Sequence, residues 1–130
     1  MRTYTLAEAR ALLSRVIPVV EELRETFIAL RALQASMAAQ SRGASGDGNL
    51  LASPWDLGGE GRVEQLSRRL KGAAARIEAW GIEVKDPERG LIDFYSQRDG
   101  EVVYLCYLLG EPDIAYFHRL ADGFAGRQPV

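Results

Sequence analysis

The residues whose types could carry chemistry lie in the C-terminal third of this 130-residue chain. They are Asp93, Cys106, Glu111 and His118, and they include the only cysteine and the only histidine. A thiol, an imidazole and carboxylates are ligand types suited to zinc or iron. No pair has a diagnostic spacing such as CxxC or HxxxH. The set therefore predicts a transition-metal or small-ligand site only as a hypothesis.

A predicted β-hairpin brings two of these residues together. Two β-rich runs, Leu91–Arg98 and Glu101–Leu109, flank the dipeptide Asp99-Gly100, which is typical of a two-residue type I′ turn. With that turn, paired residues have numbers that add up to 199. Asp93 then faces Cys106, with Cβ atoms roughly 5 Å apart.

The same pairing divides the hairpin into two faces, because side chains alternate along a strand. One face carries Asp93 and Cys106 together with Tyr95 and Tyr104. We expect the other face to cover the helices, since it is the more apolar and consists of Ile92, Phe94, Val103, Leu105 and Tyr107.

The position of His118 depends on the turn before it. If Glu111-Pro112 form a two-residue turn, His118 lies opposite Leu105 and on the other face from Cys106. A bulge at Gly110, or a helix beginning at residue 114, would place His118 on the same face as Cys106. The sequence leaves both arrangements open.

Each of these residues can also have an ordinary structural role. A lone cysteine in an apolar strand is typically a small core residue, and a histidine at the end of an element usually bonds locally. Asp93 could pair with the guanidinium of Arg127, which would fasten the tail to the sheet without catalysis. A thiol in mid-strand also gains no helix dipole to lower its pKa. We therefore predict no catalytic residue, and a non-enzyme is favoured.

The N-terminal half is predicted to be helical. Thr5 and Glu8 have the spacing of a capping box, and apolar residues then recur every three or four positions, which predicts a helix over 5–39. Pro18 inside this pattern predicts a bend. A second helix is predicted over 62–80, followed by Gly81 as a left-handed cap.

Between the helices, residues 40–61 are rich in glycine and serine and predict a mobile loop. An apolar island within it suggests that part of the loop docks on the protein. The island consists of Leu50, Leu51, Trp55 and Leu57.

The whole chain reads as a single α+β domain over 1–130. An N-terminal antiparallel helical hairpin with a long, kinked first helix should pack on a small antiparallel sheet of three to four strands. That sheet is the β-cassette of residues 81–118. The remaining residues, 119–130, are predicted to form an irregular tail, with Arg127 as its contact to the sheet.

Composition excludes several classes of protein. Sixteen basic and eighteen acidic residues give a formal charge of -2, so nucleic acid is an unfavoured partner. The local basic excess on the second helix is interpreted as a solvated face. The sequence has no run of eighteen consecutive apolar residues, so no membrane-spanning segment is predicted. The first residues lack the apolar stretch of a signal peptide, so none is expected. With a single cysteine, a reducing cytoplasm is expected.

The chain contains a set of short motifs, which are Tyr4–Ala9, Gly81–Asp86, Gly90–Phe94, Val103–Cys106, Gly110–Pro112, His118 and Gly123–Pro129. Together they resemble the motifs of a small bacterial family catalogued as domain of unknown function 2203. Where the family pattern has tryptophan, this chain has Tyr107 and Phe117, which keep an aromatic ring. The resemblance implies no activity.

Two functions are predicted from these features. The first helix would reach about 50 Å and the second about 28 Å, so part of the first apolar seam lacks a partner within the hairpin. This favours an interaction or assembly module that self-associates as a homodimer through its helices. The alternative is a metal- or small-ligand-binding protein that uses the polar face of the β-cassette, with zinc or iron as the expected metal.

Overall fold

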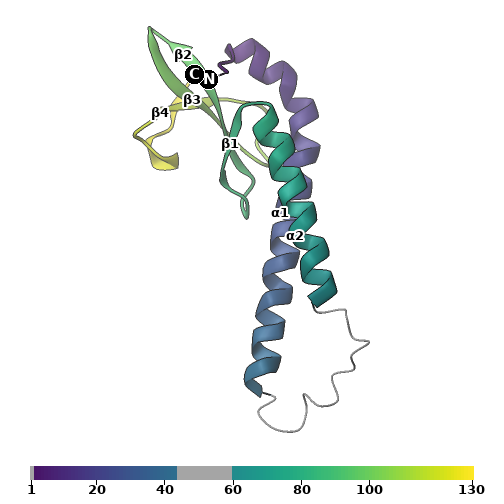
Figure 1. Cartoon of the computed structure of the whole chain (residues 1–130). Helices are drawn as coiled ribbons and strands as arrows, with labels where there is room; N and C mark the ends of the chain where they lie inside the picture. The colour runs from purple at the N-terminus through teal and green to yellow at the C-terminus, as the bar shows by residue number, and fades with distance from the viewer. Residues whose placement is uncertain (1, 44–59) are drawn as a thin grey trace.

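The computed structural model describes residues 2–43 and 60–130, and it has an α+β fold (Figure 1). Helices α1 (Leu6–Gly43) and α2 (Glu60–Ala79) come first. Strands β1 (Ile82–Asp86), β2 (Leu91–Arg98), β3 (Glu101–Leu108) and β4 (Tyr116–Arg119) follow. The short 3-10 helix η2 (Phe124–Gly126) then leads into strand β5 (Gln128–Pro129).

Both helices extend into the segment predicted as a loop, since α1 continues to Gly43 and α2 begins at Glu60. The rest of that predicted loop lies outside the described residues. So does its apolar island of Leu50, Leu51, Trp55 and Leu57.

Helix α1 begins with the predicted capping box. The Thr5 amide donates to Glu8 Oε1 at 2.8 Å, and the Glu8 amide donates to Thr5 Oγ1 at 3.1 Å. These bonds satisfy two backbone donors that the first helical turn would otherwise leave unpaired. The helix bends in the half that contains Pro18 (Figure 1), as expected where proline removes a backbone hydrogen bond.

Helices α1 and α2 lie side by side and run in opposite directions (Figure 1). Leu23 and Ile77 are fully buried, and each such side chain contributes about 1.5–3 kcal/mol relative to an exposed one. At the edge of this contact, Arg76 donates to Glu22 at 3.3 Å. Gly81 ends the second helical segment with φ +77°, which is the predicted left-handed cap.

The sheet has five antiparallel strands in the order β1-β2-β3-β4-β5. The predicted count of three to four was too low because the tail adds β5. Tyr116 pairs with Pro129 and Phe117 with Gln128, and the Val130 amide donates to the Ala115 carbonyl at 3.0 Å. The edge of β4 thus pairs with Gln128 and Pro129, which do not show the apolar alternation that predicts a strand.

The predicted hairpin register is confirmed. Asp93 pairs with Cys106 and Tyr95 with Tyr104. Asp99 and Gly100 have φ values of 52° and 79°, as a type I′ turn requires.

The apolar face of the hairpin joins the helices in one core, as expected. Phe94 and Ile92 are completely buried and Tyr4 meets Phe94 edge to face, with ring centroids 5.6 Å apart. The opposite face of the sheet is therefore free to carry polar groups. Neither described helix is apolar enough over its length to cross a bilayer.

Candidate metal centre

The pairing of β3 with β4 decides the position of His118. Tyr104 pairs with His118 and Cys106 with Tyr116, so His118 lies on the same face as Cys106 and Asp93. Of the two arrangements that the sequence left open, the one with a two-residue turn at Glu111-Pro112 does not form. The connection between the strands runs from 109 to 115, with Gly110 at φ +106°, and this longer connection shifts the register by one residue.

Asp93, Cys106 and His118 form a compact buried cluster. Their candidate ligand atoms all lie within 4.8 Å of one another, and Asp93 Oδ2 is 3.1 Å from His118 Nε2. The three residues are 1%, 0% and 3% exposed. Three separate strands, β2, β3 and β4, each contribute one of these side chains.

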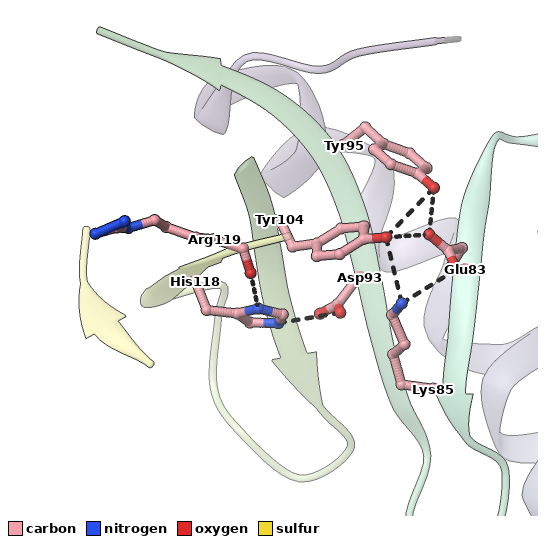
Figure 2. Close-up of polar contacts among 7 residues, drawn as sticks. All are labelled: Glu83, Lys85, Asp93, Tyr95, Tyr104, His118 and Arg119. Carbon is pink, nitrogen blue, oxygen red and sulfur yellow. Dashed lines mark hydrogen bonds and ion pairs between the residues drawn. The ribbon is translucent and has the colours of Figure 1, made fainter. Parts of the chain in front are cut away.

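A backbone contact fixes the tautomer of His118 (Figure 2). Its Nδ1 lies 2.9 Å from the carbonyl oxygen of Arg119, which can only accept a hydrogen bond. Nδ1 therefore carries hydrogen, and in the neutral ring Nε2 presents a lone pair to the Asp93 carboxylate. Two acceptors at 3.1 Å require a proton or a cation between them.

Asp93 has unused coordinating capacity. Its Oδ1 is buried and has no hydrogen-bond partner within the described part of the chain, although Oδ2 faces His118. Leaving such an atom unsatisfied costs about 1–3 kcal/mol. Burial raises the pKa of the Asp93 carboxyl, against the opposing effects of His118 and the Cys106 thiol.

Cys106 is a protonated thiol when no metal is bound. Burial, followed by the nearby Asp93 carboxylate, raises the pKa of Cys106 to about 12. A nucleophilic thiolate is therefore not favoured at neutral pH. A metal ion that displaces the proton would change this, because thiolate is the ligand form of cysteine.

The dimensions of the cluster suit a four-coordinate metal. With metal–nitrogen and metal–oxygen bonds near 2.0 Å, tetrahedral geometry puts these two ligand atoms roughly 3.3 Å apart. The distance between Asp93 Oδ2 and His118 Nε2 is 3.1 Å. The Cys106 sulfur lies within 4.8 Å of both atoms. Three protein ligands leave a fourth position open, as in catalytic zinc sites.

Glu111, also a predicted ligand, is not in the cluster. Both of its carboxylate oxygens accept from Arg127 Nη2, at 2.7 and 2.8 Å, and Oε1 also accepts from the Leu108 amide at 2.6 Å. Arg127 thus holds the tail to the turn after β3. The suggested pairing of Arg127 with Asp93 does not form, since His118 is the partner of Asp93.

A second polar group on the same face was missed from the sequence (Figure 2). Tyr95 and Tyr104 both donate to Glu83 Oε2, and these bonds lower the pKa of Glu83 to about 2. Lys85 Nζ lies 3.1 Å from Glu83 Oε1 and 4.3 Å from the centre of the Tyr104 ring. The sequence did contain a signal for this group. Glu83 and Lys85 alternate with the apolar Ile82 and Val84, which puts Glu83 and Lys85 on the polar face.

Tyr104 connects the two groups, because its ring centre is 5.2 Å from that of His118. Beside them lies a pocket of about 140 Å³. Asp93 and His118 form part of its wall, together with Lys85, Asp122 and Phe124. The buried cluster therefore borders a space that a small molecule can occupy.

The comparisons with known proteins identify a family but no activity. Searches of curated proteins and of solved structures returned no match. The model of a family described as "Uncharacterized conserved protein (DUF2203)" matches residues 2–130, nearly the entire chain, which includes every residue of the cluster and of its pocket. The resemblance seen in the short sequence motifs is thereby confirmed, and the chain belongs to the DUF2203 family.

Proposed function

We propose that this protein binds a divalent transition metal ion, zinc or iron(II), through Asp93, Cys106 and His118. The observation that carries the proposal is the buried three-residue cluster with an unpartnered Asp93 Oδ1. A buried polar atom without a partner is rare in folded proteins and calls for a specific explanation. A bound cation supplies one.

The charges of the cluster balance with such an ion. One carboxylate and one thiolate contribute two negative charges, neutral His118 contributes none, and a divalent cation brings the sum to zero. A neutral sum matters because an uncompensated charge in this buried position would be costly. The mixture of sulfur, nitrogen and oxygen donors favours zinc or iron over magnesium or calcium.

The surroundings of His118 support the same proposal. Metal-binding histidines usually donate their other ring nitrogen to a carbonyl or carboxylate, which fixes the orientation of the ring. His118 Nδ1 has that bond with the Arg119 carbonyl. A reducing compartment such as the cytoplasm would keep the Cys106 thiol available as a ligand.

Elemental analysis tests the proposal. Protein prepared without chelator or affinity tag should contain up to about one equivalent of zinc or iron, and apoprotein should take up one equivalent of added zinc. Cys106→Ser and Asp93→Asn should lose most of this uptake. Zinc uptake below roughly a tenth of an equivalent by folded apoprotein would refute the proposal.

Self-association through α1 is a second candidate function. α1 has 38 residues and α2 has 20, so α1 extends beyond its partner. On α1, Leu33 and Met37 are only partly covered within the described structure, and their spacing of four residues puts them on the same side of the helix. A second copy of the helix would bury these apolar side chains.

Light scattering at micromolar concentration tests this candidate. A dimer that dissociates on Met37→Glu would support it, since a charge would then have to be buried at the contact. A monomer in the unaltered protein would refute it. Ala35→Glu, at an exposed position on the opposite side of the same helix, is the control with the same change of charge.

A further inference from the structure

We propose that the pocket beside the cluster binds a small carboxylate, with one oxygen on the metal ion and the other accepting a hydrogen bond from Lys85. This rests on the proposed metal site, because the metal supplies the first contact. The observation that points to it is the placement of Lys85 in the wall of the same pocket as Asp93 and His118.

The fourth coordination position should face the pocket. Asp93 and His118 border this space directly, and the three protein ligands come from strands that back onto the core. Any exchangeable ligand must therefore approach from the pocket side. A metal site with three protein ligands accepts water or substrate at its fourth position.

Lys85 has a donor available for this ligand. An ammonium group has three hydrogens, and Glu83 Oε1 at 3.1 Å and the Tyr104 hydroxyl at 3.3 Å account for two of them. The side chain is held in place by the Tyr104 ring and remains about one third exposed. Its charge also acts on Asp93, where it opposes the rise in the pKa of that carboxyl. The ammonium thus belongs to the same pocket wall as two of the proposed metal ligands.

Charge and size define the ligand further. Arg89 lies over the ring of Phe124, with its guanidinium carbon 4.8 Å from the ring centre, and Phe124 is part of the pocket wall. Glu83 offsets the charge of Lys85 and Asp122 offsets that of Arg89, so the preference for a carboxylate comes from the metal ion and from the remaining hydrogen of the Lys85 ammonium. A pocket of about 140 Å³ is close to the size of a cavity that holds benzene. The ligand should therefore be a monocarboxylate of about six heavy atoms or fewer.

Cobalt(II) in place of the native metal provides the assay. The thiolate-to-cobalt charge-transfer absorption reports metal binding by Cys106, and the visible ligand-field bands report changes at the open position. Acetate should shift the ligand-field bands to saturation. Acetamide, which has the same shape but no charge, should bind at least about tenfold more weakly, because only the anion gains a charge-assisted bond.

Lys85→Met tests the proposed contact, and Lys71→Met on the exposed surface of α2 is the matched control. The first change should weaken acetate binding about tenfold or more, and the second should leave it unchanged. Each variant is first required to show the charge-transfer absorption.

The outcomes separate the two proposals. If cobalt gives no thiolate absorption, the metal site itself is refuted. If the absorption is present but acetate leaves the ligand-field bands unchanged, only the carboxylate proposal fails. Equal acetate binding by Lys85→Met and the unaltered protein would also overturn it.

Discussion

Zinc should stabilise this protein against heat, and Cys106→Ser should remove that effect. A ligand that binds only the folded state adds RT ln(1 + [L]/Kd), which is about 2.7 kcal/mol at a hundredfold excess over Kd. For a chain of this length, 1 kcal/mol corresponds to about 4 °C. Zinc should therefore raise Tm by about 10 °C.

The substitution acts on the metal site more than on the fold. Serine is nearly the same size as cysteine, and its hydroxyl can donate to the unpartnered Asp93 Oδ1. In the presence of a chelator we therefore expect Cys106→Ser to cost only about 1 kcal/mol. With zinc, the variant should gain less than about 2 °C, because a soft ligand has been lost.

Thermal unfolding followed by circular dichroism, with chelator and with zinc, measures both effects. Tyr104→Phe is the control, since it keeps the ring against His118 but removes the hydroxyl that Glu83 accepts from. This control should lose stability and still respond to zinc. A full zinc response in Cys106→Ser, or none in the unaltered protein, would contradict the reasoning.

Three further predictions concern the surrounding structure. The pKa of Glu83 is lowered from 4.5 to about 2 on folding, so its stabilising effect is present above pH 4.5 and is lost as pH falls toward 2. In acid titrations, Glu83→Gln should therefore lose less stability over this range than the unaltered protein. Arg127→Met should lower the free energy of unfolding by about 2 kcal/mol in denaturant titrations, because Glu111 loses its partner. It should also speed hydrogen exchange of the Val130 amide, because the tail is released. Unchanged exchange would contradict this. Gly90→Ala should lower the free energy of unfolding by about 2 kcal/mol or more, since φ is +69° and a Cβ would lie 2.7 Å from Leu109 Cβ. The control Gly123→Ala, where a Cβ would meet nothing within 4 Å, should lower it by less than about 0.5 kcal/mol.

Local sequence signals were enough to predict the structure where it is determined by contacts between residues that are close in the sequence. The capping box at Thr5 and the Asp99-Gly100 turn each specify their geometry within four residues. The turn also sets the register of the whole hairpin, so the proximity of Asp93 and Cys106 followed from counting. The α+β class followed from the change of periodicity at Gly81.

Features that depend on longer connections could not be predicted in this way. The connection from 109 to 115 contains Gly110, and a one-residue change in its pairing moves His118 to the other face of the sheet. Glu111 was predicted as a ligand because its contact with Arg127 forms only when the tail folds back, which no local pattern indicates. β5 has two residues and is fixed by the free edge of β4, so no periodic pattern could reveal it.

X-ray absorption spectroscopy at the zinc edge of the zinc-loaded protein tests the central claim most directly. We predict one sulfur neighbour at about 2.3 Å and nitrogen or oxygen neighbours at about 2.0 Å, with the sulfur absent in Cys106→Ser. A zinc ion surrounded only by nitrogen and oxygen in the unaltered protein would contradict the assignment of Asp93, Cys106 and His118 as its ligands.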